Sequence, residues 1–122
     1  MAQFHPLDPA FPMDRQLVVA AAPVVLVNVF TVDASDADAL LRAWERDALW
    51  MKKQPGFIST QLHRAIGDSC AFQNYAIWES VYLFRQAFTH LDFQSHIADY
   101  PPSAVISPHL FQRMTVANLC VA

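Results

Sequence analysis

The sequence has few glycines, few cysteines and no excess of basic residues. Its 122 residues include two glycines, Gly56 and Gly67, which excludes a glycine-rich loop of the kind that binds nucleotide phosphates. The two cysteines, Cys70 and Cys120, form no CxxC pair, and we interpret them as free thiols in a reducing compartment. Because the net charge is −3, there is no basic patch and we expect no nucleic-acid partner.

The sequence also lacks the usual metal-binding patterns. The five histidines show neither an HExxH motif nor the paired spacing of a zinc site, so we expect no metal ligand among them: His5, His63, His90, His96 and His109. His63 lies in a predicted strand and could act as a base. A histidine at a sheet edge more often only makes a hydrogen bond, and we favour that role.

Hydrophobic residues, in contrast, are abundant. They make up 54% of the sequence against 16% charged residues, which indicates one packed domain whose surplus of surface hydrophobicity is best explained by self-association. The run from Leu17 to Val27 resembles the core of a signal peptide, but Asp8 and Asp14 precede it. At 11 residues this run is too short to span a bilayer. We therefore expect a cytoplasmic protein with no membrane partner.

The predicted elements follow the order strand, helix, strand, strand, helix, strand. Residues 1–22 form a proline-rich arm that wraps its own or a neighbouring subunit, with Phe4 and Phe11 as anchors, and residues 23–122 form the domain. A helix capped by Ser35 follows the first strand, and Pro108 belongs to an irregular loop before the last strand. The predicted strands are 23–32, 57–66, 71–78 and 110–121, and the later helices are 79–90 and 92–99. This is the α+β, ferredoxin-like split βαβ arrangement with an antiparallel sheet.

Two of these strands carry polar residues where core residues are expected. On the strand that begins at Ala71, alternation puts Phe72, Asn74 and Trp78 on one face, with Asn74 and Trp78 roughly 13 Å apart. Asn28 is the strongly polar residue in the middle of the first strand. The first and third strands are neighbours in this fold, so both asparagines and Trp78 line one cavity if they face the helices. Buried amide and indole groups need partners, which a flat ligand can supply.

Three segments resemble the antibiotic biosynthesis monooxygenase family: V-N-V-F at 27–30, Q-P-G-F-I-S-T-Q-L-H-R at 54–64 and N-x-x-x-W-E-S at 74–80. The resemblance extends from about Val24 to Met114. It implies a small dimeric α/β barrel, in which two four-stranded sheets pack against each other across the dimer interface. Quinone-forming members oxidise anthrone-like polycyclic aromatics with O2 and use no flavin, haem or metal. The resemblance therefore implies a homodimer that takes a small aromatic substrate and O2, without a cofactor.

The same resemblance implies roles for single residues. Asn28, Asn74 and Trp78 match the functional asparagines and tryptophan of the quinone-forming enzymes and are the expected catalytic residues. Phe84 stands where some of these enzymes carry an active-site tyrosine, which leaves the proton-transferring group unassigned. The expected substrate-binding residues are aromatic side chains and two histidines: Phe72, Phe84, Phe88, Trp44, His63 and His96.

The residue types suit this reaction. The C–H of an anthrone is acidic because the resulting anion is delocalised onto the ring oxygen. Amide donors from Asn28 or Asn74 would stabilise that oxyanion in a dry pocket. The carbanion can then pass an electron to O2 directly, while Trp78 stacks on the guest and offers its N–H to oxygen or a peroxide.

Two other functions are compatible with the sequence. Haem-degrading monooxygenases share this fold and the first-strand asparagine, and they also need a ligating histidine with a tryptophan nearby. His96 follows Phe93 by three residues where that pattern requires four, and Ala87 occupies the tryptophan position. We favour a solvated His96 beside Asp92 and Asp99. The second alternative is a non-catalytic dimer that binds a small aromatic molecule.

Overall fold

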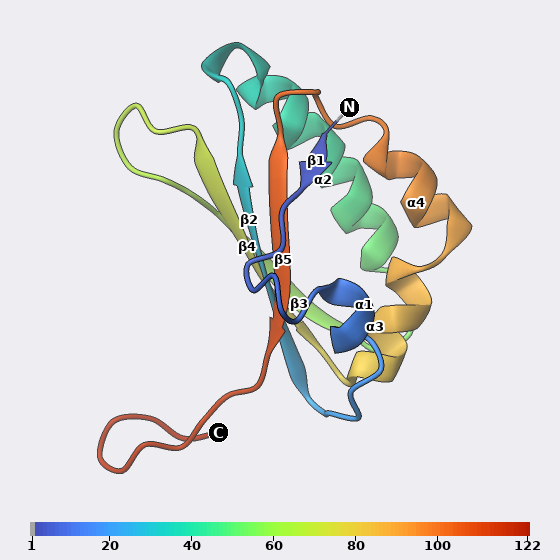
Figure 1. Cartoon of the computed structure of the whole chain (residues 1–122), viewed down its shortest axis with the longest axis vertical. Helices are drawn as coiled ribbons and strands as arrows, with labels where there is room; N and C mark the ends of the chain where they lie inside the picture. Colours follow the sequence, from blue (N-terminus) through green and yellow to red (C-terminus); the bar gives the residue numbers. More distant parts are fainter. Residues whose placement is uncertain (1) are drawn as a thin grey trace.

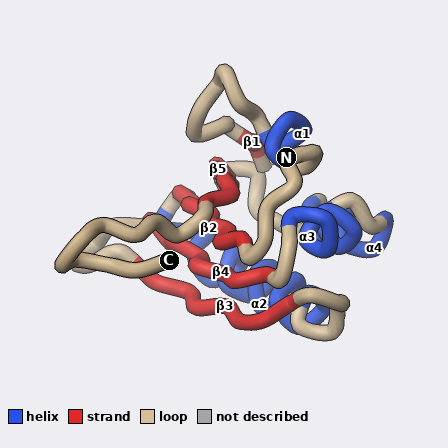
Figure 2. The backbone as a smooth tube through the Cα atoms, turned by 90° about the horizontal axis from the view of Figure 1, so that it is seen from below, coloured by secondary structure: helices blue, strands red, loops and turns tan. Residues whose placement is uncertain are grey.

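The α-helices pack against one face of a five-stranded sheet, and the other face carries no helix within residues 2–122, which the computed structural model describes (Figures 1 and 2). The strand order is β1-β5-β2-β4-β3, and β1 is parallel to β5 while the other pairs are antiparallel. The strands are β1 (Gln3–Phe4), β2 (Val24–Thr31), β3 (Phe57–Arg64), β4 (Ala71–Trp78) and β5 (Val105–Phe111).

The helices complete the predicted ferredoxin-like arrangement. They are α1 (Met13–Gln16), α2 (Ala37–Met51), α3 (Val81–Phe88) and α4 (Leu91–Ile97), with a 3-10 turn, η1 (Ala34–Asp36), in front of α2. From β2 onward the order β2-α2-β3-β4-α3-α4-β5 confirms the predicted fold class. None of the helices in residues 2–122 is long and apolar enough to cross a membrane.

Helices α2 and α3 each bury one apolar face against the sheet, as their spacing of apolar residues predicts. Leu40 on α2 and Phe84 on α3 are 0% and 1% exposed. Two clusters of buried side chains result, one around Phe30, Phe72 and Leu40 and the other around Trp78 and Phe84. Residues from both clusters line the cavity described below.

The last strand lies earlier in the chain than predicted. It spans Val105–Phe111 rather than 110–121, and Pro108 lies inside it rather than in a loop. Proline is tolerated there because of where its backbone nitrogen points. The carbonyls of Ala104 and Ile106 accept hydrogen bonds from the N–H groups of Gln3 and His5, so the backbone polar groups of every second residue of β5 face β1. Pro108 is the next residue whose backbone nitrogen faces this edge, but β1 has already ended there. No strand hydrogen bond is therefore lost through the missing N–H of the proline.

The predicted cap of the first helix was wrong. Ser35 lies inside η1, and neither N-terminal boundary residue of η1 or α2 makes a side-chain capping bond. A serine distant in sequence takes part at this end instead. The Ser103 hydroxyl accepts from the backbone N–H of Asp33 at 3.2 Å and donates to Asp36 Oδ2 at 2.7 Å. Such a long-range bond leaves no local pattern in the sequence.

The N-terminal arm lies along its own chain. Residues of β1 pair with β5, and a short helix, α1, lies within the predicted proline-rich arm. Of the two predicted aromatic anchors, Phe4 is 43% exposed and Phe11 is half-buried. Gln16 is 4% exposed, and its side chain joins the carbonyl of Phe11 at 2.9 Å to the N–H of Leu110 at 2.8 Å. The buried glutamine therefore ties the arm to the end of β5.

Gly56, in the predicted Q-P-G-F segment, lets α3 approach the start of β3. Its φ is +90°, and a Cβ atom at this position would lie 2.5 Å from Leu83 Cβ. Its carbonyl accepts from the N–H of Glu79 at 2.8 Å. At the following helix, the Ser80 side chain accepts from the N–H of Leu83 at 3.1 Å and caps α3. Both hydrogen bonds fix the start of α3 beside the first residues of β3 and the end of β4.

Candidate functional site

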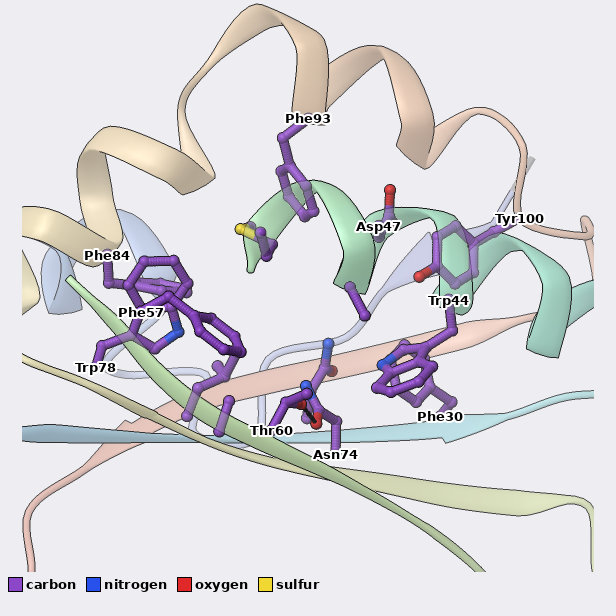
Figure 3. A pocket seen from close by; sticks show the side chains of 15 residues that line it. Phe30, Trp44, Asp47, Phe57, Thr60, Asn74, Trp78, Phe84, Phe93 and Tyr100 are labelled. Atoms are coloured by element: carbon purple, nitrogen blue, oxygen red, sulfur yellow. Dashed lines mark hydrogen bonds between the residues drawn. The ribbon is translucent and has the colours of Figure 1, made fainter. Parts of the chain in front are cut away.

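A cavity of about 70 Å3 lies between the sheet and the helices (Figure 3). Its walls are mostly apolar and aromatic, with a few polar groups, which is the composition of small-molecule sites. It is lined by Leu26, Asn28, Phe30, Trp44, Asp47, Ala48, Met51, Phe57, Thr60, Asn74, Ala76, Trp78, Phe84, Phe93 and Tyr100. The sheet supplies the polar amides and α2 supplies the single carboxylate of this wall.

The two predicted asparagines meet in this cavity. Asn28 on β2 is directly opposite Asn74 on β4, and both line the cavity. The Thr60 hydroxyl on β3 donates to Asn74 Oδ1 at 2.5 Å, which leaves the amide N–H groups of Asn74 available to a guest. Asn28 Oδ1 is buried and has no hydrogen-bond partner within residues 2–122. A buried acceptor without a partner costs roughly 1–3 kcal/mol, so its presence favours a ligand-binding role.

Trp78 closes one end of the cavity, where it is 1% exposed. Its ring meets Phe57 edge to face at 5.5 Å and Phe84 at 5.4 Å between centroids. Figure 3 shows these three rings together at one end, with Phe30, Trp44 and Tyr100 at the other. The predicted residues Trp44 and Phe84 therefore lie in the cavity wall at opposite ends.

The remaining predicted substrate-binding residues lie elsewhere. Phe72 is 2% exposed and belongs to the core beside Phe30, outside the cavity wall. Phe88 lines a smaller cavity of about 50 Å3 that adjoins the first. His63 pairs with Gln73 on the outer face of the sheet and is exposed, with Nδ1 3.3 Å from the Gln73 carbonyl oxygen. His96 lies on α4 over a surface groove rather than in either cavity wall.

His96 is not solvated beside Asp92 and Asp99, as we had expected, but contacts Asp47. Its Nδ1 lies 3.2 Å from Asp47 Oδ1, and its side chain is 25% exposed. The contact is short but poorly aligned, since neither atom has a hydrogen-bond partner within residues 2–122. The helix α4 thus places an imidazole behind the cavity wall, next to a carboxylate on α2.

Asp47 is a site residue that the sequence reading missed. It is 5% exposed, although it carries a carboxylate in an apolar wall. Burial raises the pKa of this carboxyl, and the hydrogen bond from Tyr100 and the attraction of His96 and Arg46 offset only part of that effect. A signal was present: Trp44, Asp47 and Met51 recur at helical spacing, which puts Asp47 on the apolar face of α2.

Tyr100 is the second missed residue. It follows α4, is 6% exposed and stacks parallel to Phe30 with 6.1 Å between ring centroids. Burial raises the pKa of its hydroxyl far above the usual value, and the neighbouring Asp47 carboxylate raises it further. The hydroxyl therefore stays protonated and acts as a hydrogen-bond donor. Its place before Pro101 in an apparent loop gave no sequence signal for a site residue.

Known proteins resemble the chain over most of its length. The profile of the antibiotic biosynthesis monooxygenase family matches residues 23–98. SnoaB from Streptomyces nogalater, a cofactor-independent oxygenase, has 26% sequence identity and a TM-score of 0.72 over 80% of this chain and 99% of SnoaB. A protein from Shewanella loihica, provisionally described as a monooxygenase, has 31% identity and a TM-score of 0.67 over 80% of this chain and 99% of its own.

No curated protein matches the chain by sequence. The family profile nevertheless covers more than half of the chain, and the fold agrees with that of SnoaB. The predicted membership and the predicted oxidoreductase class are thereby confirmed. The chain belongs to the antibiotic biosynthesis monooxygenase family.

Proposed function

We propose that this chain is a cofactor-independent monooxygenase that oxidises an anthrone-like polycyclic phenol to a quinone with O2. The observation that carries this proposal is the pairing of Asn28 and Asn74 on neighbouring strands, inside an aromatic cavity that Trp78 closes. A flat, mostly apolar guest with one polar edge fits such a wall. The likeness to SnoaB, which is a cofactor-independent oxygenase, supports the same reaction class.

In this proposal each polar group has a distinct task. The N–H groups of Asn74 donate to the ring oxygen of the guest, where negative charge develops when the carbon-bound proton leaves. Asn28 Oδ1 accepts from a neighbouring phenolic hydroxyl. The resulting carbanion transfers an electron to O2, and the peroxide that forms on carbon loses water to give the quinone. One substrate and one O2 thus yield one quinone and one water.

The cavity must enlarge to take such a guest. Pockets for drug-sized molecules are about 300–1,000 Å3, well above the roughly 70 Å3 of this cavity. The smaller adjoining cavity shares part of its wall, including Met51, Phe84 and Phe93. Methionine adapts readily to a new shape, so we infer that Met51 and the Phe93 ring on α4 move to join the two spaces.

We do not favour the haem-degrading alternative. It requires a histidine that reaches the cavity, whereas His96 contacts Asp47 and borders the outer groove. The polar groups of the cavity are amides, a carboxylate and the hydroxyls of Thr60 and Tyr100. Of these only a tyrosine is a known haem ligand, through its phenolate, and Tyr100 stays protonated because burial raises its pKa far above the usual value.

We further propose that the chain works as a homodimer in the cytoplasm. Members of this family are usually dimeric, and the face of the sheet opposite the helices exposes the apolar side chains of Val29, Tyr75 and Phe111. A second copy of this sheet would cover them, as in the predicted barrel. The thiols of Cys70 and Cys120 are free, which agrees with a reducing compartment.

The function is tested by following quinone absorbance after dithranol is added to the purified protein in air and under argon. We expect O2-dependent quinone formation above the rate without protein, and a loss of about 10²–10³-fold in kcat for Asn74→Ala. Trp78→Phe should also be slower. Gln73→Ala is the matched control, because Gln73 neighbours Asn74 on the same strand but points to the other face. Wild-type turnover in both cavity variants would contradict the proposal.

A further inference from the structure

Asp47 and Tyr100 are the only ionisable side chains of residues 2–122 that line the cavity. The proposed reaction begins with removal of a carbon-bound proton, which the asparagines and the aromatic rings cannot accept. Resting on that proposed function, we propose that Asp47 and Tyr100 form its proton relay, in which the Tyr100 hydroxyl meets the guest and Asp47 takes the proton. Tyr100 thus serves as a catalytic residue.

The positions of these two residues suit the relay. Both residues line the same cavity wall and are at least nine-tenths buried, and the Tyr100 hydroxyl lies near enough to the Asp47 carboxyl to lower its pKa. Figure 3 places them on the helical side of the cavity, across from Asn74 and Thr60 on the sheet. A guest between the two sides would have its oxygen at the amides and its acidic carbon at the hydroxyl. In an anthrone these two atoms lie at opposite positions of the central ring.

The transferred proton has a route to the surface. His96 Nδ1 lies 3.2 Å from Asp47 Oδ1, and the His96 side chain also borders a surface groove with Arg46 and Lys53. The charged groups that face Asp47 from the elements packed on it are His96 on α4 and Arg46 on α2 itself. Arg46 in turn lies 3.4 Å from Asp99 at the surface. Asp47 is therefore buried from the bulk solvent but one contact away from an imidazole that reaches it.

The chemical step is a coupled transfer of two protons. The C–H bond of the guest breaks and its proton bonds to the Tyr100 oxygen, while the hydroxyl proton of Tyr100 moves to the Asp47 carboxylate. The electron pair of the C–H bond stays on the guest and is delocalised onto the oxygen that Asn74 holds. Tyr100 ends the step as a neutral hydroxyl and Asp47 as a neutral acid. His96 then takes the proton from Asp47 and restores the carboxylate.

The electrostatics agree with this order of events. Burial raises the pKa of the Asp47 carboxyl, which makes it a better proton acceptor than an exposed aspartate. The pKa of the Tyr100 hydroxyl is raised so far that a free phenolate does not form. In this relay Tyr100 also supplies the hydroxyl that is missing at Phe84, where some members of the family carry a tyrosine. It does so from the segment after α4, whereas Phe84 lies on α3.

The test separates proton removal from the reaction with O2. Under argon, dithranol mixed with the wild-type protein should form its coloured anion, whose absorbance is followed by stopped flow. We expect Asp47→Asn and Tyr100→Phe to slow anion formation about 10²–10⁴-fold while dithranol binding, measured by quenching of tryptophan fluorescence, changes little. As the pH falls to the folded-state pKa of Asp47, which burial raises, the wild-type rate should fall because Asp47 becomes protonated, and this fall should be absent in Asp47→Asn.

The matched control is Asp99→Asn, since the Asp99 side chain is 47% exposed and pairs with Arg46 at the surface. It should form the anion at the wild-type rate. Anion formation at the wild-type rate in Asp47→Asn and Tyr100→Phe would overturn the relay, as would a wild-type protein that binds dithranol without ionising it. If the wild type forms the anion under argon but no quinone in air, the relay stands and the proposed oxygenase function fails.

Discussion

Asn28 and Asn74 lie directly opposite each other on β2 and β4 and face the same cavity, but their hydrogen-bond partners differ. Asn74 Oδ1 accepts from the Thr60 hydroxyl at 2.5 Å, whereas Asn28 Oδ1 is buried without a partner in residues 2–122. One amide is held so that it donates, and the other keeps a free acceptor. The pair suits a guest edge that carries a ketone beside a phenolic hydroxyl.

The orientation of Asn74 predicts an effect of Thr60 on activity. Thr60→Val keeps the branched shape but removes the donor that holds Asn74 Oδ1. Since one hydrogen bond contributes about 0.5–1.5 kcal/mol, we expect kcat/KM for quinone formation to fall about 2–10-fold. The free energy of unfolding should also fall by about 1–3 kcal/mol, because the buried Asn74 Oδ1 loses its partner. Thr31→Val, at the exposed end of β2, is the control and should be neutral. Wild-type activity of Thr60→Val, together with an inactive Asn74→Ala, would show that Thr60 does not position the amide.

Gly56 supports a prediction about stability. Gly56→Ala places a Cβ atom against Leu83 and forces a non-glycine residue to φ +90°. We expect a loss of about 2–4 kcal/mol in the free energy of unfolding, measured by urea titration. Gly67→Ala is a sharp comparison, because Gly67 also has a positive φ of +67° but no atom lies within 4 Å of its added Cβ. Gly67→Ala should cost only about 1 kcal/mol, and equal losses would contradict the role of Leu83.

Local patterns were enough to predict the order of elements and the meeting of the two asparagines. Alternation placed Asn74 and Trp78 on one face, and the split βαβ order made β2 and β4 neighbours, so the pairing of Asn28 with Asn74 followed. Helical spacing likewise placed Trp44 and Phe84 toward the sheet. These features depend on periods of two and of about 3.6 residues, which a sequence displays directly.

The features that the sequence did not predict depend on contacts between distant residues. Proline usually interrupts a strand, so Pro108 predicted a loop. It fits within β5 because β1 ends before it and needs no hydrogen bond from that position. Ser103 substitutes for the predicted cap of the first helix across about 70 residues of chain. His96 on α4 contacts Asp47 on α2, whereas local spacing pointed to its nearer acidic neighbours. In each case a contact between residues distant in the sequence outweighed the structure that the local sequence favours.

Burial of Asp47 predicts an unusual dependence of stability on pH. Its pKa is raised in the folded protein above the usual 3.8, so from that pH upward to the folded pKa the folded state binds more protons than the unfolded chain. The free energy of unfolding of the wild type should therefore fall over this range as pH rises. Asp47→Asn cannot ionise and should lose this fall, so that its stability relative to the wild type increases with pH and then levels off.

This comparison is made by urea titration of both proteins at a series of pH values above 4. Asp99→Asn is again the control, because its exposed side chain should show no such trend against the wild type. A constant difference between Asp47→Asn and the wild type over the whole series would mean that the carboxyl titrates alike in the folded and unfolded states. That result would remove the physical basis for calling Asp47 a strong proton acceptor.

The face of the sheet opposite the helices predicts the oligomeric state. Tyr75 on β4 is 38% exposed and lies on the face opposite the cavity, in register with Val27 on β2. If this face packs against a second copy, Tyr75→Lys buries an unpaired charge in the interface. Such a charge costs several kcal/mol, so we expect the dimer dissociation constant to rise at least about 100-fold. Sedimentation equilibrium should then find a dimer for the wild type and a monomer for the variant at the same concentration.

Tyr82→Lys is the matched control for this prediction. Tyr82 is 58% exposed but lies on α3, on the helical side of the sheet, so a lysine there should leave the dimer intact. Circular dichroism of both variants checks that the fold is retained. If Tyr75→Lys stays dimeric, the sheet face is not the interface. The exposed apolar groups of the C-terminal segment, such as Met114 and Leu119, would then be the next surface to test.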